Sequence, residues 1–235
     1  MASALLCLES SGNLCSVAVS GFDREVFLQS EPGQKHTEVI LGMIRESLSA
    51  SGGSREALQA IAFGSGPGAF TGLRVACGIA QGMGWALSLP LVPVNTLLAL
   101  AYEHSETLEE GSRLLAAIDA RMHECYCSVF RCENNEFKEV TAPALCKPSE
   151  LQAIADDNGA DFLCGNAFRV YADEIGELTP KKLLSTNDVN AQMIVPLAQK
   201  YFAENKTVDA AEASPLYVRD HVALTIEERK AEKSR

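Results

Sequence analysis

GSGPGAFTGLR, residues 64–74, is the most informative stretch of this 235-residue sequence. It follows an apolar run at residues 59–63, typical of a strand, and precedes a segment at residues 73–88 that predicts a helix ending before Leu89-Pro90. Its four glycines permit positive φ angles and close backbone approach. The N–H groups of such a turn point at the space before the helix, a geometry that binds anions. The loop therefore predicts an α/β unit with either a ligand site or a tight packing contact at this turn.

Three known ligand and catalytic motifs fit this loop poorly. A phosphate-binding P-loop needs a lysine after its last glycine, where Leu73 stands. A nucleophile elbow needs a glycine two residues before Ser65, where the sequence has Phe63. The dinucleotide fingerprint fits residues 64–69 formally, but no acidic residue ends the next predicted strand. A turn that packs the helix against its own sheet is at least as good an interpretation as a ligand site.

The N-terminal half of the chain predicts a three-stranded meander followed by alternating helices and strands. Turn-forming residues at 10–13 and 21–23 separate the first strands. The segment 36–51 has one apolar stripe and is followed by Gly52-Gly53, which is typical of an amphipathic helix and its end. The predicted strands are residues 5–8, 15–19, 26–29, 59–63 and 91–94, and the predicted helices are residues 36–51, 73–88 and 96–104.

The second half starts the same pattern again. Glu9 closes the first predicted strand and Cys15 opens the second; Asp119 and Cys125 do the same 110 residues later. This repeat predicts a duplicated two-lobed α/β fold with a cleft between the lobes. We expect lobes at residues 1–106 and 107–213 and a tail at 214–235 that packs back on them. The remaining predicted elements are strands 114–118, 125–127, 136–140 and 162–164 and helices 149–155, 167–174 and 188–204.

Composition and charge disfavour several classes of protein. A net charge of −11 argues against a protein that grips nucleic acid by itself, because phosphates attract basic patches. No apolar run reaches the roughly 18 to 20 residues of a membrane span, and no basic segment precedes the apolar start, so we expect a cytoplasmic protein. The eight cysteines include several that lie singly in apolar runs, as reduced thiols do. Cys125, Cys127 and Cys132 have a C-x-C-x4-C spacing that is unusual for zinc, so we expect no metal there.

Motifs spread over nearly the whole chain resemble those of the TsaB family, bacterial proteins required to make threonylcarbamoyladenosine in tRNA. The loop at 66–74 resembles the family's GPGSFTGLR, with Ala69 in place of serine. Residues 9–11, Glu-Ser-Ser, depart from the more usual Asp-Thr-Ser. The other matching segments are KHTE at 35–38, PLVPVNTL at 90–97, IDARM at 118–122 and PLYVR at 215–219. The resemblance implies the two-lobed fold of actin, Hsp70 and sugar kinases.

The resemblance also implies a subunit without catalysis. Proteins of this family bind TsaD, the threonylcarbamoyltransferase, with the ATPase TsaE assisting and with TsaC and tRNA reached indirectly. We therefore expect no catalytic residue, no metal ion, no membrane association and no autonomous nucleic-acid binding. Whether the chain forms a homodimer when its partner is absent is left undecided by the sequence. TsaD carries an H-x-x-x-H metal pair where this chain has Thr96 and Leu100, and neither binds a metal as imidazole does. We expect His104 to be exposed at a helix end.

The nucleotide site of the fold is degraded in this sequence. Actin-like ATPases hold phosphates with an acid and a glycine turn in each lobe, and the equivalents here begin at Glu9 and Asp119. We expect both acids to stabilise their own turns and the chain to have no cofactor of its own. Weak binding of ADP or ATP at the interface with a partner remains an alternative. The degenerate anion-loop candidates are Glu9, Ser10, Ser11, Gly66, Gly68, Thr71, Asp119 and Arg121. The rival interpretation is a small-molecule kinase or a glycoprotease-like peptidase of the same superfamily.

Two helices are the candidates for the partner interface. Helix 73–88 has small residues at four-residue spacing on two faces, and small residues let a second helix approach closely. Helix 36–51 displays Leu41 beside its main stripe, which is more apolar surface than one sheet contact needs. The alternative is that the glycines only bring the helix close to its own sheet. The interface candidates are His36, Leu41, Gly72, Leu73, Ala76, Gly78, Ala80 and Gly82.

Overall fold

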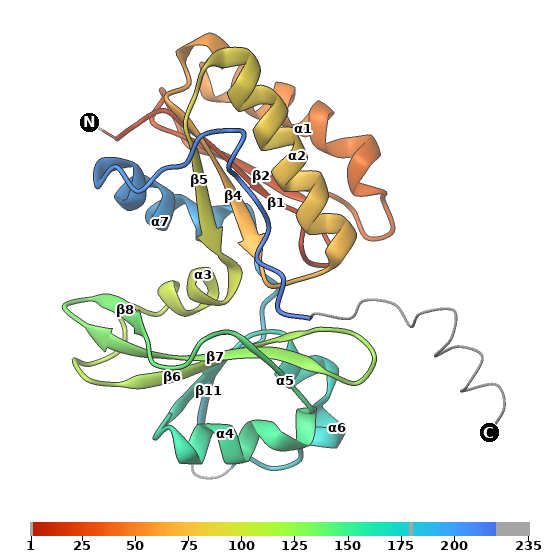
Figure 1. Cartoon of the computed structure of the whole chain (residues 1–235), viewed down its shortest axis with the longest axis vertical. Coiled ribbons are helices and arrows are strands. Elements are labelled where there is room, and N and C mark those ends of the chain that lie inside the picture. The colour runs from red at the N-terminus through yellow and green to blue at the C-terminus, as the bar shows by residue number, and fades with distance from the viewer. Residues whose placement is uncertain (1, 179–180, 220–235) are drawn as a thin grey trace, which may run out of the picture.

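A computed structural model describes residues 2–178 and 181–219 and shows two lobes, one above the other in Figure 1. Each lobe is built on a mixed β-sheet, with helices on its outer face. Helix α3 (Thr96–Tyr102) lies between the two sheets. Among the described residues, no helix is both long and apolar enough to cross a membrane.

The first sheet has the strand order β3-β2-β1-β4-β5. Its β1–β2 and β2–β3 pairs are antiparallel, whereas its β1–β4 and β4–β5 pairs are parallel. Strands β1 and β4 are buried along their whole length, because helices cover both faces of the sheet at its centre. The strands are β1 (Leu5–Glu9), β2 (Ser16–Ser20), β3 (Val26–Gln29), β4 (Ala60–Gly66) and β5 (Leu91–Asn95).

The second sheet repeats this arrangement strand for strand. Its order is β11-β10-β6-β7-β8, with antiparallel β6–β7 and β7–β8 pairs and parallel β6–β10 and β10–β11 pairs. The predicted duplication is therefore confirmed in the topology of the two sheets. The strands are β6 (Arg113–Asp119), β7 (Cys125–Glu133), β8 (Glu136–Glu139), β10 (Phe162–Cys164) and β11 (Lys182–Ser185), and β9 (Ala144–Cys146) pairs with β7 as an addition.

Local capping explains where the longer helices begin and end. Helix α1 ends where Gly52 takes a φ of +77°, and the Gly52 N–H group then donates to backbone carbonyls of the last turn. Helix α7 begins after Asn190, whose side chain accepts hydrogen bonds from two N–H groups of the first turn. Besides α3, the helices are α1 (His36–Ser51), α2 (Phe70–Leu87), α4 (Leu151–Asp157), α5 (Ala167–Val170), α6 (Ala172–Ile175) and α7 (Ala191–Ala203), with short 3-10 turns at Arg55–Ala57 and Pro148–Glu150.

Helix α7 returns to the first lobe. It follows β11 in the chain but packs on β1, β2, β4 and β5, and it contacts α3. Its buried side chains Ile194, Leu197 and Ala198 fill the inner face of the first sheet. The packing therefore places α7 with the first lobe, although the expected second lobe, residues 107–213, includes it in sequence.

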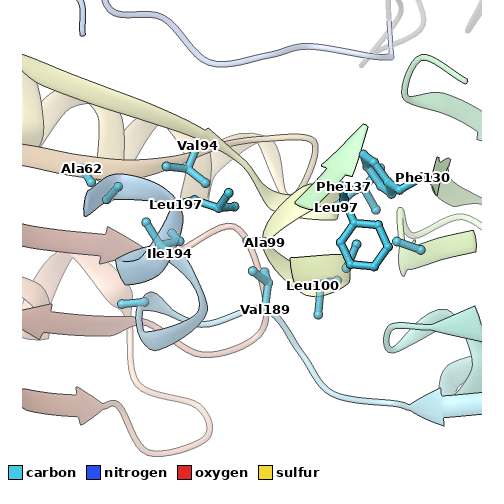
Figure 2. Packing of buried hydrophobic residues seen from close by; sticks show 14 of the residues in the cluster. Ala62, Val94, Leu97, Ala99, Leu100, Phe130, Phe137, Val189, Ile194 and Leu197 are labelled. Carbon is cyan, nitrogen blue, oxygen red and sulfur yellow. The ribbon is translucent and has the colours of Figure 1, made fainter. Parts of the chain in front are cut away.

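One hydrophobic core runs through both lobes at α3 and α7. Figure 2 shows Leu97 and Leu100 of α3 between the two sheets. The rings of Phe130 and Phe137 pack edge to face at 6.4 Å in the second lobe. The other labelled members of this cluster are Ala62, Val94, Ala99, Val189, Ile194 and Leu197. The lobes are therefore joined by continuous apolar packing rather than by a linker.

The structure shifts some predicted ends and adds two strands. Helix α2 begins at Phe70, three residues earlier than expected, because the Leu73 N–H already donates to the Ala69 carbonyl. The helix expected at residues 167–174 is two short helices separated at Tyr171. Strands β9 and β11 were not predicted, since each is three or four residues long and lies at a sheet margin, where alternation of polarity gives little signal.

Helix α2 has one buried and one open face of small residues. Ala76 and Ala80 are fully buried, and a Cβ at Gly84 would lie 2.7 Å from the Leu91 side chain. By contrast, a Cβ at Gly78 or Gly82 would meet no atom within 4 Å. The expectation that Ala76 and Ala80 belong to a partner interface is therefore wrong, because both pack inside the first lobe.

We predict opposite effects of alanine at two glycines of α2. Gly78→Ala should raise the free energy of unfolding by up to about 1 kcal/mol, because its space is open and alanine favours a helix. Gly72→Ala should lower it by about 1 to 3 kcal/mol, because the new Cβ would lie 1.8 Å from the Ser10 carbonyl oxygen. Urea unfolding at low protein concentration measures both. Equal destabilisation by the two variants would contradict the open face.

Candidate functional site

The glycine-rich loop packs against the turn that follows β1. The Ala69 N–H donates to the Ser11 carbonyl at 2.8 Å, and the Ser10 hydroxyl donates to the Gly72 carbonyl at 2.7 Å. A Cβ at Gly68 would lie 2.5 Å from the Ser11 Cβ. The glycines of the loop therefore allow close packing within the first lobe, which supports the packing interpretation of the motif.

The residues on either side of this contact are buried rather than presented to a partner. Leu73 is 2% exposed, and Gly72 lies directly beneath the Ser10 carbonyl. Gly66 has a φ of +115°, and a Cβ there would crowd both Leu73 and the Leu216 carbonyl. The expectation that Gly72 and Leu73 form part of a partner interface is therefore wrong, because their surfaces are used inside the chain.

Glu9 closes β1 and is completely buried. Its Oε1 accepts a hydrogen bond from the Ser11 N–H at 2.5 Å, whereas Oε2 has no hydrogen-bond partner among the described residues. Burial raises the pKa of the Glu9 carboxyl, against the smaller effect of hydrogen bonds from the Ser11 turn. A Cβ at Gly64 would lie 1.7 Å from Oε2, so the neighbouring strand backbone closes over the carboxyl. Glu9 therefore holds its own turn and does not open onto solvent.

Asp119 closes β6 and is the equivalent acid of the second lobe. Its Oδ1 accepts hydrogen bonds from the Arg121 N–H at 2.7 Å and from the Tyr171 hydroxyl at 2.6 Å. Burial and the Asp119 carboxylate raise the pKa of Tyr171, so its hydroxyl stays a donor. The Arg121 guanidinium lies 3.2 Å from Oδ2 and also donates to the Asn13 side chain of the first lobe at 2.5 Å. Asp119 is thus committed to its turn, and Arg121 bridges the lobes.

These two turns border a cleft of about 230 Å³ between the lobes. Typical small-molecule pockets have roughly 300 to 1,000 Å³, so this cleft is small. The tail residues 216–219 form part of its wall. Of the anion-loop candidates, Ser11, Gly68, Thr71, Asp119 and Arg121 line the cleft, whereas Glu9, Ser10 and Gly66 lie behind its surface.

Within the described parts of the chain, no group of three or more His, Cys, Asp or Glu side chains could hold a metal ion. The Cys127 and Cys146 sulfurs lie 3.5 Å apart, on β7 and β9. Cys132 points elsewhere, since its thiol contacts the Leu108 carbonyl at 3.7 Å. The C-x-C-x4-C residues are therefore not gathered at one point, and the neighbour that the sequence did not suggest, Cys146, comes from an unpredicted strand.

Two histidines tie elements together. The His104 side chain is only 13% exposed, and its Nε2 lies 3.0 Å from the Ser185 hydroxyl. Burial lowers the pKa of His104, which favours the neutral ring. The expectation of an exposed His104 is wrong, because the unpredicted strand β11 covers it. His36 Nε2 lies 3.3 Å from the Asn13 carbonyl oxygen, so it links α1 to the turn after β1.

The open faces of α1 and α2 form an apolar groove of about 640 Å³. Leu41 on α1 is 60% exposed, and Trp85 on α2 is 77% exposed. Gly82 lines the groove, and Gly78 lies one turn before it on the same helix. Trp85 borders a neighbouring hollow rather than the groove itself. We use the name helix face for the groove residues Leu41, Ile44, Gly82 and Met83 together with the nearby exposed α2 positions Gly78 and Trp85. Trp85 was missed by the sequence reasoning, although its spacing of three residues from Gly82 was a usable signal.

Comparisons with known proteins agree along the chain. A family model described as TsaD, tRNA N6-adenosine threonylcarbamoyltransferase, matches residues 30–226. The tRNA threonylcarbamoyladenosine biosynthesis protein TsaB of Haemophilus influenzae is 34% identical over 229 residues, covering 93% of this chain and 94% of that protein. TsaB of Escherichia coli K12 is 34% identical over 224 residues, covering 93% and 96%. The structure of YeaZ from Pseudomonas aeruginosa superposes with a TM-score of 0.79 at 33% identity, covering 92% of this chain and 99% of that one. Since this likeness in sequence and structure extends through both lobes, the chain belongs to the TsaB family.

Proposed function

We propose that this chain is a non-catalytic subunit in the synthesis of threonylcarbamoyladenosine in tRNA, and that it binds a TsaD protein through the helix face. The two TsaB relatives, from Haemophilus influenzae and Escherichia coli, are both described as threonylcarbamoyladenosine biosynthesis proteins, which supports this pathway. The observation that carries the partner proposal is the helix face itself. Its Leu41 and Trp85 side chains are exposed, and its two glycines leave the helix backbone bare.

The physical chemistry of the helix face suits a helical partner. Exposed large apolar side chains cost solvation free energy, and a partner that covers them recovers it. Glycines at 78 and 82 are four residues apart, so a second helix can approach the α2 backbone closely along this row. Arg45 and Arg55 border the groove and provide charge at its rim. When TsaD is absent, a second copy of the chain is the alternative occupant that we propose.

The interlobe cleft supports a role without catalysis. Asp119, which lines it, and Glu9, which lies behind its surface, are both engaged in their own turns, and Glu9 is closed off from solvent. The tail borders the cleft and leaves only about 230 Å³. We propose that the chain has no cofactor of its own, that any ADP or ATP binds weakly at the interface with the partner, and that TsaE, TsaC and tRNA are reached through TsaD. The net charge of −11 favours this indirect contact with tRNA, in the cytoplasm.

A charge placed on the helix face should break the complex. We predict that Gly82→Arg weakens binding to TsaD by at least about 2 kcal/mol, roughly 30-fold in Kd, because the interface would bury an unpaired charge. The fold should survive, since a side chain at position 82 meets open space and arginine favours a helix more than glycine does. Isothermal titration with TsaD measures the affinity, and circular dichroism of the same sample measures the fold.

Leu183→Arg is the matched control, because Leu183 is 43% exposed on β11 of the second lobe and lies away from the groove. It should bind TsaD as the unmodified chain does. Unchanged affinity of a folded Gly82→Arg chain would refute the interface. Equal loss in both variants would point to charge rather than to the helix face.

Neutralising Glu9 and Asp119, the acids that close β1 and β6, should leave tRNA modification intact. We predict that Glu9→Gln and Asp119→Asn each retain activity within about threefold in a system reconstituted with TsaC, TsaD, TsaE and tRNA, because neither acid belongs to a complete catalytic set. The measurement is threonylcarbamoyladenosine formed per minute with limiting amounts of this chain. A loss of several hundredfold in a folded variant would overturn the non-catalytic role, and micromolar binding of ATP with magnesium to the chain alone would favour the kinase alternative.

The raised pKa of Glu9 predicts a specific pH dependence of stability. Below the ordinary carboxyl pKa of about 4.5 the group is protonated in both states. Above it the unfolded chain loses the proton while the folded chain keeps it, so stability falls as pH rises until the folded pKa is reached. Glu9→Gln removes this loss. Its gain in free energy of unfolding should therefore be larger at pH 7 than at pH 4.5 in urea titrations; an equal difference at both values would contradict a raised pKa.

A further inference from the structure

The tail crosses between the lobes beside the cleft. After α7, the chain runs along the first lobe and then turns toward the second, where the described part ends at Arg219 (Figure 1). Residues 215–219 are one of the segments that match the family by sequence, and the proposed function makes no use of them. Their contacts fall on two separate parts of the molecule.

The first set of contacts fixes this segment to the first lobe. The Leu216 N–H donates to the carbonyl of Ser65, a buried residue near the end of β4, at 2.6 Å. The Tyr217 ring lies 5.5 Å from the Phe70 ring, centroid to centroid. Arg74 donates from Nε to the Tyr217 hydroxyl at 3.0 Å, and its guanidinium lies 3.9 Å from the centre of the Phe70 ring. Two of the segments that match the family, residues 66–74 and 215–219, thus contact each other at the start of α2.

The second set of contacts fixes the same segment to the second lobe. Arg219 donates from Nη2 to the Ala120 carbonyl at 3.1 Å and to the Glu124 carboxylate at 2.5 Å. Its Nη1 contacts the Met122 sulfur at 3.5 Å. The Arg219 side chain is 15% exposed, so this ion pair is largely shielded from water and salt. All three partners belong to the turn between β6 and β7, and residues 121–123 of this turn have positive φ angles.

The two attachment points lie on opposite sides of the interlobe cleft. Loop residues 67–69 line it from the first lobe, residues 119–121 from the second, and residues 216–219 complete the wall between them. The apolar core of α3 and α7 also joins the lobes and reaches the cleft at Ala120 and Tyr126, where Val218 packs against it, but this core does not include the loop at 67–69. Residues 215–219 and the Arg121–Asn13 hydrogen bond both tie the lobes at the cleft. Ties at the cleft and a packed joint at the core together fix the angle between two bodies, and that angle becomes freer to change when a tie is removed.

We propose that residues 215–219 are a strap that holds the two lobes closed, and that its release lets the cleft open. The strap works as one device because its two ends are only a few residues apart. Cutting the attachment at either end therefore removes the whole tie that the strap makes between the lobes. This inference goes beyond the proposed function and needs no partner, so its test uses the full chain alone.

Hydrogen exchange of the full chain tests the strap at each end. Arg219→Met keeps an unbranched side chain but removes the guanidinium that makes the second-lobe attachment. Tyr217→Ala removes the ring and hydroxyl contacts of the first-lobe attachment and leaves the backbone hydrogen bond of Leu216. The reporters are the Ala69 N–H in the first lobe, which donates to Ser11, and the Ala120 N–H in the second, which donates to Glu124. We expect Arg219→Met to speed exchange at Ala69, and Tyr217→Ala to speed exchange at Ala120, by about tenfold or more. The double variant should match the faster single variant rather than multiply the two effects.

Glu212→Ala, at an exposed tail position before the strap, is the control and should exchange as the unmodified chain does. Tyr217→Phe keeps the ring contact with Phe70 and should stay within about threefold of the unmodified chain. Faster exchange confined to the lobe whose own attachment was removed would overturn the strap, because the contacts would then be only local. Equal acceleration at the centres of β1 and β6 would also overturn it, since the variants would then lower global stability.

Discussion

Apolar packing of α3 and α7 between the sheets is the interaction on which the rest of this molecule depends. The two sheets have the same strand order, and in each repeat the last helix follows the last parallel strand. These two helices contact each other and share one cluster with residues of both lobes, so neither lobe has a separate closed core on its inner side. Burial on this scale sets the position of the lobes. The cleft, the tail and the outer helices then take their places relative to that joint.

The glycine-rich loop shows how a motif shared by a family can serve packing. In a fold of this kind the loop borders the interlobe cleft, and its N–H groups are suited to anions. Here the same backbone lies so close to residues 10 and 11 that side chains at positions 68 and 72 would collide with them. Acids at the ends of β1 and β6 are likewise engaged with their own turns. The turns at the ends of β1 and β6 thus use their polar groups for contacts inside the chain.

Helix α2 divides its small residues between two tasks. Ala76, Ala80 and Gly84 let the helix lie close to the first sheet, whereas Gly78 and Gly82 leave a bare row toward solvent. The small side chains of the inner row let the helix approach its own sheet closely. Each glycine of the outer row lowers helix stability, and a second helix packed on that row could compensate for this loss. Leu41 of α1 and Trp85 of α2, both exposed, belong to the same helix face. A single helix therefore connects the core of the lobe to the helix face.

Apart from β9, β11 and the split of α5 from α6, the sequence by itself determined the element order, the repeat, the family motifs and the limits of helix α1, because periodicity, capping residues and glycine turns act over a few neighbouring residues. It also placed Glu9 and Asp119 at equivalent strand ends. Only the tertiary structure decided which small-residue face of α2 turns inward, that α7 joins the first lobe, that β11 covers His104, and that the two ends of the tail segment reach different lobes. These features depend on contacts between residues far apart in the chain, and local sequence carries no record of which surface will meet which.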